Sequence, residues 1–227
     1  RRQRQMCIRD RKTPLTSISG YAELIENGMA KQEDIPTFGH RIHKEAQRMI
    51  TLVSDILQLS ELDGMSKQQE NSPTADFVPV DLGVLVKDVA TNMTVNARKA
   101  YITLQYKVQP VTVRGSHDLL TELVTNLCDN AIRYNRPGGH VELSCGTNAD
   151  GCPYFCVEDN GIGIPQDSQS RVFERFYRVD KSRSKATGGT GLGLAIVKHI
   201  AVLHGARIDL ESTVGTGTTI RIIFPKM

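Results

Sequence analysis

The chain has 227 residues, of which 39% are hydrophobic and 23% charged, proportions that are ordinary for soluble globular proteins and exclude disorder throughout. The length allows one large domain or two small ones, and a net charge of +3 is too small to indicate a nucleic-acid partner. The five cysteines are odd in number and scattered, which favours reduced thiols in the cytoplasm, and no apolar run approaches the roughly 18 residues of a membrane span, so we expect no membrane contact by this segment.

Two helical patterns open the chain. In the first, Pro14 lies where the first turn of a helix or a kink tolerates proline, and the helix ends at the turn that contains Gly28. Its apolar residues at helical spacing are Leu15, Ile18, Ala22 and Ile25. The second begins after the predicted N-cap Asp34 and ends at Asp63. This second pattern has an apolar stripe at four-three spacing, made of Ile42, Ala46, Met49, Val53, Ile56, Leu59 and Leu62.

The stripe predicts how the two helices are used. Two helices joined by a short loop cannot bury two apolar stripes alone. We therefore expect a homodimer in which two hairpins form a four-helix bundle. The alternative is that the hairpin packs against the remainder of its own chain.

A change of composition divides the chain into two domains. Residues 64–79 are polar and irregular and are typical of a linker. We accordingly assign residues 1–63 to the helical hairpin, residues 64–79 to the linker, and residues 80–227 to a second domain.

The second domain alternates helices and strands. Helices are predicted from the N-cap Asp81 to about residue 100, around residues 119–131, and from residue 193 to about residue 204. The second of these has an apolar face made of Leu119, Leu123, Leu127 and Ala131. Strands are predicted at residues 102–108, 141–145, 154–157, 206–210 and 218–224, the second and third forming a hairpin. The fold class is therefore α+β: a helical hairpin followed by an α/β sandwich with helices on one face of a mostly antiparallel sheet.

Residues 159–163, with the sequence Asp-Asn-Gly-Ile-Gly, follow one of these apolar strands. Glycine allows positive φ and lets a ligand approach the backbone closely. A carboxylate beside such a turn can accept a hydrogen bond from an exocyclic amino group. We therefore predict that Asp159, Gly161 and Gly163 form part of a nucleotide pocket in which Asp159 binds adenine.

A polar helix face precedes that turn. Its residues are Asn126, Asp129, Asn130, Arg133 and Tyr134, on the side opposite Leu127 and Ala131. Amide oxygens are hard ligands suited to a magnesium ion held partly by phosphates, and arginine is a permanent cation for phosphate oxygens.

Two glycine-rich stretches follow. The first, containing Gly189, Thr190, Gly191, Leu192, Gly193 and Leu194, leads directly into a helix, where backbone N–H groups form an anion site. It is neither a P-loop nor a dinucleotide fingerprint. The second, residues 215–219, is a turn in which hydroxyls such as that of Thr218 can reach a base through water, although a plain hairpin turn has the same sequence. Between residues 164 and 189, aromatic residues and a charged tract fit a mobile lid.

Together these motifs resemble the catalytic core of bacterial sensor histidine kinases, with a Bergerat-type (GHKL) ATP-binding domain. Residues 126–134 resemble that family's N box, 159–163 its first glycine box, 173–176 its F box, 189–194 its second glycine box and 215–218 a third. The resemblance implies ATP and Mg²⁺ as cofactors. It also implies that Asn130 ligates the magnesium ion with Asn126 beside it, that Asp159 binds the adenine amino group, and that the glycines of the lid hold the phosphates.

The hairpin resembles the family's dimerisation and phosphotransfer domain, because Lys12, Thr13 and Pro14 match the downstream part of its H box. Alignment on these residues places Arg9 where the family has the phosphoacceptor histidine. Guanidinium is always protonated and cannot attack phosphorus. The resemblance implies that Asp10 corresponds to the acid that orients the imidazole in the family. It also implies that Thr13 acts in dephosphorylation of a response regulator receiver domain.

The resemblance leaves several interpretations of the function. The family implies a kinase core that autophosphorylates and passes the phosphoryl group to a response regulator aspartate, in the cytoplasmic part of a membrane sensor. One hypothesis is that the residues before Lys12 are a sequence artefact and that the natural protein has the histidine. The alternative is an ATP-binding dimer that does not autophosphorylate, or a response-regulator phosphatase. An ATPase like gyrase or Hsp90 is disfavoured by the preceding hairpin.

Overall fold

The computed structural model describes the backbone of residues 2–68, 77–179 and 189–226, and the side chains of residues 14–65, 77–179 and 189–226. The chain divides into two compact units, Arg1–Leu57 and Gln58–Met227. The division falls inside a helix, so the second unit begins with the last turns of that helix.

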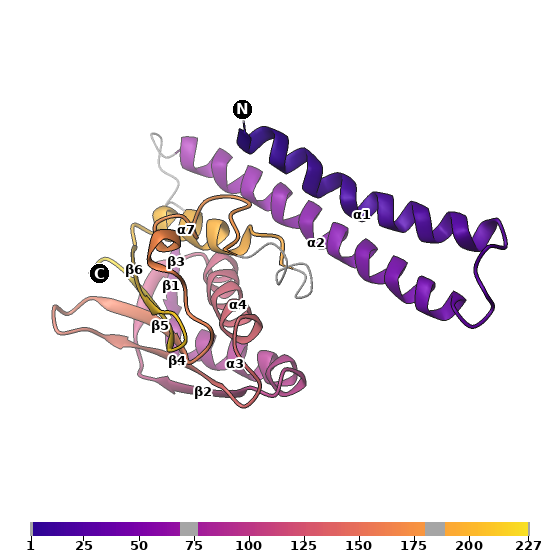
Figure 1. Ribbon diagram of the computed structural model, residues 1–227. Coiled ribbons are helices and arrows are strands. Elements are labelled where there is room, and N and C mark those ends of the chain that lie inside the picture. Colours follow the sequence, from indigo (N-terminus) through magenta and orange to yellow (C-terminus); the bar gives the residue numbers. More distant parts are fainter. Residues whose placement is uncertain (1, 69–76, 180–188, 227) are drawn as a thin grey trace. The chain divides into compact units, whose positions relative to one another are not determined.

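The first unit is a helical hairpin. Helix α1 spans Arg2–Glu26 and runs antiparallel to helix α2, which spans Ile35–Gln68 (Figure 1). Gly28, at φ +65°, ends α1 as predicted, since a residue at this position must enter the left-handed region. Near the turn, the rings of Tyr21 and Phe38 lie 5.0 Å apart, and an Arg41 Nη1 atom donates to the Tyr21 hydroxyl over 2.5 Å. These contacts fix the two helices to one another.

The second helix is longer than predicted. The expectation that it ends at Asp63 and Gly64 is wrong, because α2 continues to Gln68. Leu59 and Leu62 are almost completely buried within the second unit and hold this part of the helix in place. The packing offsets the roughly 1 kcal/mol that a mid-helix glycine costs. The predicted linker thus starts inside a helix, and residues 69–76 lie outside the described part.

The second unit is an α/β sandwich, which confirms the predicted fold class. Its elements are β1 (Val78–Asp81), α3 (Leu82–Lys99), β2 (Thr103–Val108), β3 (Thr112–Gly115), α4 (His117–Arg133), β4 (His140–Thr147), β5 (Pro153–Asp159), α5 (Gln166–Gln169), α7 (Gly193–Leu203), β6 (Arg207–Thr213) and β7 (Gly217–Ile223). Strands in the order β2-β4-β5-β7-β6 form the main sheet, in which β2 is parallel to β4 and the other pairs are antiparallel. The strands β1 and β3 form a separate antiparallel pair.

Three helices cover one face of the main sheet, with α4 in contact with both α3 and α7 (Figure 1). The predicted apolar face of α4 is confirmed at Leu123, Leu127 and Ala131, which are buried, and Phe155 of β5 is fully buried beneath the helices. Burial of apolar side chains such as these is the dominant favourable term in folding. The opposite, polar face of α4 therefore points away from this core.

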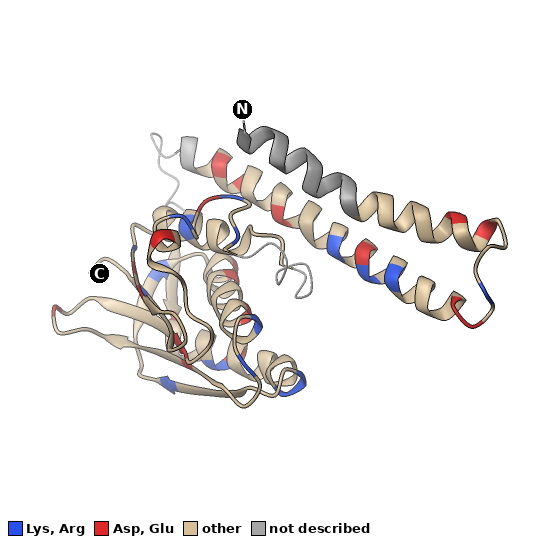
Figure 2. Cartoon of the chain, viewed as in Figure 1, with Lys and Arg blue, Asp and Glu red and all other residues tan. Residues whose placement is uncertain are grey.

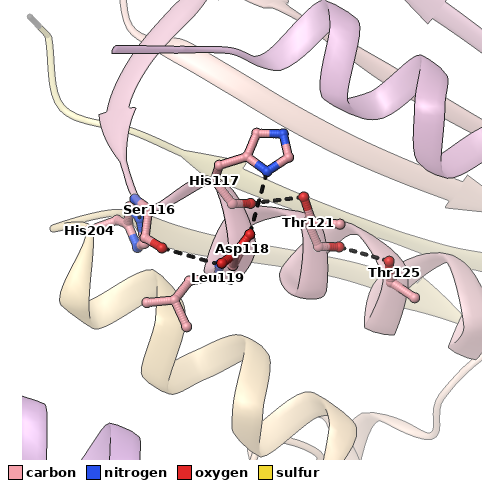
Figure 3. A network of polar contacts seen from close by, with 7 residues as sticks. All are labelled: Ser116, His117, Asp118, Leu119, Thr121, Thr125 and His204. Carbon is pink, nitrogen blue, oxygen red and sulfur yellow. Dashed lines mark hydrogen bonds and ion pairs between the residues drawn. The ribbon is translucent and has the colours of Figure 1, made fainter. Parts of the chain in front are cut away.

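Side chains cap the helices that lead to the site. Asp81 accepts a hydrogen bond from the Val84 N–H, as the sequence predicts, and Ser116 is the N-cap of α4. Figure 3 shows the buried His204, just after α7, beside Ser116. The Ser116 N–H donates to His204 Nε2 over 3.2 Å, and His204 Nδ1 lies 2.8 Å from the Ile200 carbonyl oxygen. The ring is therefore neutral, and burial lowers its pKa.

Charge is dispersed over the described residues. Along α2 the basic side chains, with one acid, lie in the first half of the helix, and the described part of the second half carries acids alone (Figure 2). Over the second unit acidic and basic side chains are scattered (Figure 2). Among the described helices, none combines the length and the apolar character needed to cross a membrane.

Candidate functional site

Asp159 lies at the end of β5, opposite Val141 of β4 and Thr218 of β7. Its Oδ1 atom accepts a hydrogen bond from the Gly161 N–H over 2.8 Å, and the Thr218 N–H also bonds the carboxylate. Burial outweighs these bonds and raises the pKa of Asp159 to about 6. At neutral pH the group is therefore an anionic acceptor in a partly buried position, a state that a ligand N–H would stabilise.

Close backbone contacts explain the glycines around Asp159. A Cβ atom on Gly161 would lie 2.5 Å from the Tyr134 carbonyl oxygen. A Cβ atom on Gly163, whose φ is +69°, would lie 2.1 Å from the Thr213 carbonyl oxygen. A Cβ atom on Gly217 would lie 1.9 Å from the backbone carbonyl oxygen of Asp159. Real Cβ atoms do not approach this closely, so only glycine permits this turn. Residues 159–163 and the turn before β7 thus form one structure around the carboxylate.

The end of α4 joins the same structure. The Ile162 N–H donates to the Tyr134 carbonyl oxygen over 3.1 Å, and the His140 N–H donates to Asn160 Oδ1 over 2.7 Å. Tyr134 is the C-cap residue of α4. The polar face of α4 and the Asp159 turn are consequently held side by side.

The two amides of α4 face the start of α7. Asn126 Oδ1 lies 2.8 Å, and Asn130 Nδ2 3.6 Å, from the position of a Cβ atom on Gly193. The Asn126 amide nitrogen donates to the Glu122 carbonyl oxygen over 3.1 Å, so its oxygen is the atom presented to the site. Within the described ranges, no group of three His, Cys, Asp or Glu side chains could hold a metal. Amide oxygens are hard ligands of the kind that a magnesium ion accepts alongside waters and phosphate oxygens.

Arg133 and Tyr134 lie beside the second glycine-rich stretch. The Tyr134 hydroxyl is 3.1 Å, and an Arg133 Nη1 atom 3.7 Å, from the position of a Cβ atom on Gly189. Arg133 also forms an ion pair with Asp129 over 2.7 Å. From the sequence, Asp129 was assigned to the polar face but not to an ion pair. The spacing of four residues between Asp129 and Arg133 on a helix is a signal for such a pair.

The second glycine-rich stretch turns directly into α7. Gly191 has a φ of +74°, the Leu192 N–H donates to Thr190 Oγ1 over 3.3 Å, and α7 begins at Gly193 with Leu194 next. The N-cap residue Leu192 is fully buried and supplies no side-chain hydrogen bond to the helix. The first turn of α7 lies close to Asn126, and a helix start of this kind has the geometry and partial positive charge that favour an anion.

The region predicted to be a lid is partly described. It contains α5, and Phe176 has a φ of +62° while its N–H donates to the Gly191 carbonyl oxygen over 2.8 Å. This bond attaches the aromatic segment to the second glycine-rich stretch. Residues 180–188 lie outside the described part, so the motion of the lid stays a prediction.

Two polar residues near Thr218, Ser212 and Gln169, were not predicted from the sequence to belong to the site. The Ser212 hydroxyl lies 2.9 Å from Thr218 Oγ1, and Gln169 of α5 donates to the carbonyl oxygens of Ile164 and Ser212. Ser212 lies just beyond the predicted strand 206–210, and its contacts with Ile164 and Gln169 are with residues far away along the chain, so no spacing in the sequence marks it.

The H-box residues belong to the first helix. Arg9, Asp10 and Thr13 lie on α1, and their side chains are outside the described residues. The phosphoacceptor position therefore rests on the sequence alone.

Comparisons with known proteins cover both units. Residues 115–227 match the family of histidine kinase-, DNA gyrase B-, and HSP90-like ATPases, and residues 10–64 match the His Kinase A (phospho-acceptor) domain. The sensor-like histidine kinase SenX3 of Mycolicibacterium smegmatis is 38% identical over 216 residues, which cover 95% of this chain and 54% of that protein.

Two solved structures are also similar. The mycobacterial sensor histidine kinase MprB is 31% identical with a TM-score of 0.57, over 66% of this chain and 97% of that one. Full-length ShkA in complex with AMPPNP is 25% identical with a TM-score of 0.68, over 99% of this chain and 45% of that one. The chain spans from about a third to about half of the length of the curated relatives it matches.

Proposed function

The chain belongs to the sensor histidine kinase family, and on that premise we propose that it is the ATP-dependent kinase core of a two-component signalling system. The observation that carries the proposal is Asp159, an acceptor in a partly buried turn whose glycines tolerate no side chain. AMPPNP in the ShkA structure supports a nucleotide as the ligand.

The arrangement assigns a part to each side of the site. Asp159 would accept a hydrogen bond from the 6-amino group of adenine, which fixes the base at one end. The N–H groups at the start of α7, with Arg133 nearby, would neutralise the phosphates at the other end. Phosphoryl transfer asks mainly for such positioning and charge neutralisation.

Magnesium fits the amide pair of α4. Asn130 would hold the ion through its amide oxygen and Asn126 would lie beside it, because the ion prefers hard oxygen donors. When bound, the ion neutralises charge on the transferring phosphate. The chain's own contribution is to present these amides at the start of α7, next to the N–H groups that face the phosphates.

The acceptor is the unusual part. In the family a neutral imidazole nitrogen forms a bond to the γ-phosphorus while the bond to the β,γ-bridging oxygen breaks and ADP leaves. Arg9 occupies the aligned position, and it lies just outside the matched residues 10–64. We infer that this chain binds ATP without becoming phosphorylated at position 9, with Asp10 standing where the family has the acid that orients the imidazole and Thr13 where it has the hydroxyl used in dephosphorylation.

The proposal extends to partners. The hairpin would dimerise and present its acceptor region to the receiver domain of a response regulator. Exposed apolar side chains on the hairpin support dimerisation, among them Leu15, Ile50, Val53 and Leu57. We place the chain in the cytoplasmic part of a membrane-anchored sensor, as an expectation from the family.

A second candidate function is favoured by Arg9. If arginine is the natural residue, the protein would be a non-phosphorylating ATP-binding dimer that aids dephosphorylation of a response regulator through Thr13. If the residues before Lys12 are a sequence artefact, the natural protein would have the histidine. Resequencing of the gene across this junction distinguishes the two, and a clean arginine codon rules out the artefact.

The test is incubation with ATP labelled at the γ-phosphate. We expect no acid-labile label on the unmodified chain, label on the Arg9→His variant, and none on a variant that carries Arg9→His and Asp159→Asn together. Label on the unmodified chain would show that the acceptor is a residue other than the one at position 9. Failure of the unmodified chain to bind ATP at all would remove the nucleotide site.

A further inference from the structure

Ser212 lies at the centre of a hydrogen-bond network behind the Asp159 turn. Its hydroxyl is 2.9 Å from the Gly217 carbonyl oxygen, 2.8 Å from the Ile164 N–H and 2.9 Å from Thr218 Oγ1. A serine hydroxyl has one hydrogen and two acceptor lone pairs. The three contacts therefore use its whole capacity.

The directions of these bonds are determined by the partners. A carbonyl oxygen can only accept, so the Ser212 hydrogen is donated to Gly217. The Ile164 N–H can only donate, so it occupies one lone pair of Ser212. The remaining partner is Thr218, whose hydroxyl must then donate its hydrogen to the second lone pair. Thr218 consequently has only acceptor lone pairs to present in any other direction.

Thr218 is also the strand partner of Asp159. The two residues are directly opposite one another in the pairing of β5 with β7, and the Thr218 N–H bonds the Asp159 carboxylate. The Asp159 carboxylate and the Thr218 hydroxyl are therefore two acceptors on neighbouring strands. Such a pair fits a ligand group that carries two hydrogens and repels one that is itself an acceptor.

We propose that Ser212 is a specificity-determining residue of the nucleotide site: by accepting the Thr218 hydrogen, it keeps Thr218 an acceptor beside Asp159 and so selects 6-amino over 6-oxo purine nucleotides. This inference rests on the proposed function of the same site. Thr218 would meet the amino group directly or through a water that it orients.

Gln169 supports the position of Ser212. Its amide nitrogen donates to the carbonyl oxygens of Ile164 over 3.0 Å and Ser212 over 2.9 Å. These two bonds hold the Ile164 segment against β6 and keep the Ile164 N–H on the Ser212 hydroxyl. Gln169 is thus a positioning residue: it keeps the Ile164 N–H as a donor to Ser212, on which the direction of the bond between Ser212 and Thr218 depends.

The test compares dissociation constants for ATP and ITP, which differ in the 6-substituent, by calorimetry in the presence of magnesium. The unmodified chain should prefer ATP. Ser212→Ala should reduce that preference by about tenfold, because the freed Thr218 hydroxyl can turn and donate to the 6-oxo group. Ser212→Thr, which keeps a hydroxyl, should retain the preference, and Ser212→Cys, of similar size but with a poor acceptor, should lose part of it.

Repeating the comparison in a chain that carries a second substitution distinguishes a role of Ser212 in specificity from a purely structural role. In a Thr218→Val chain, Ser212→Ala should leave the ratio of the two constants unchanged, because no hydroxyl is left to redirect. Equal weakening of ATP and ITP by Ser212→Ala, or the same loss of preference in both backgrounds, would overturn the inference. If the unmodified chain does not bind ATP, the proposed function fails instead.

Discussion

Asp159→Asn should stabilise the fold and abolish ATP binding. The side chain keeps its size and can still accept the Gly161 N–H hydrogen bond, but it loses the charge that burial disfavours. It also turns an acceptor-only group into one that presents N–H hydrogens, which repel the amino group of adenine. Stability and binding should therefore change in opposite directions.

The magnitude follows from the pKa. Burial raises the pKa of Asp159 from 3.8 to about 6, and each pKa unit corresponds to about 1.4 kcal/mol. The product is about 3 kcal/mol, which we reduce to about 1–2 kcal/mol because the group is only partly buried and part of its hydrogen bonding is lost. Since the folded pKa is raised, the native state holds the proton more tightly, and its advantage is complete below pH 4 and is lost as the pH rises through 6.

Urea unfolding at pH 4 and pH 7.5 measures this effect, with calorimetry of ATP binding on the same samples. We expect the variant to be more stable than the unmodified chain at pH 7.5 and about equally stable at pH 4. Asp150→Asn, which removes the same charge from an exposed turn, is the matched control and should change neither property. A variant that is destabilised at pH 7.5, or that gains the same stability at both pH values, would refute the reasoning.

Three further predictions concern other parts of the chain. Gly163→Ala should destabilise the second unit by about 2 kcal/mol or more and eliminate ATP binding, whereas Gly64→Ala, in open space on α2, should stabilise by about 1 kcal/mol; thermal unfolding compares them. His204→Gln should destabilise the fold by about 2 kcal/mol, because a buried hydrogen bond is disturbed. The unmodified chain should lose stability as the pH falls below about 6.5, because the histidine takes up a proton more readily in the unfolded state, and the variant should lack this dependence; unfolding at several pH values measures both effects. Val53→Asp should convert a dimer to monomers in sedimentation velocity, whereas Ser54→Asp, on an exposed polar position of the same helix, should not.

Long periodic elements could be predicted from the sequence. The stripe on α4, the N-cap at Asp81 and the glycine-ended α1 are local signals, and the structure agrees with each. The strands β1 and β3 were missed because four residues are too few for a period of two to be visible. The end of α2 was misplaced because burial of Leu62 overrides the helix-breaking tendency of Gly64.

The candidate site shows the same division. Asp159 and its glycines form a short motif, so they could be recognised from their order along the chain. Ser212 could not, because its importance comes from Ile164 and Gln169, which lie more than 40 residues earlier in the chain and meet it only in the folded state. The directions of hydrogen bonds are a property of such long-range contacts, which no spacing along the chain encodes.

The register of the sheet also determines where the chain can accept extra length. Ser212 and Thr218 face one another across the tight turn between β6 and β7, so a single inserted residue there would flip one of them to the other face. The turn at residues 148–151 lies at the opposite end of β5 from Asp159, about 20 Å away along the strand, and its Ala149 and Asp150 are exposed. A fluorescent reporter inserted between these two residues should leave nucleotide titrations unchanged, which makes this turn the natural attachment point for a sensor of the bound state.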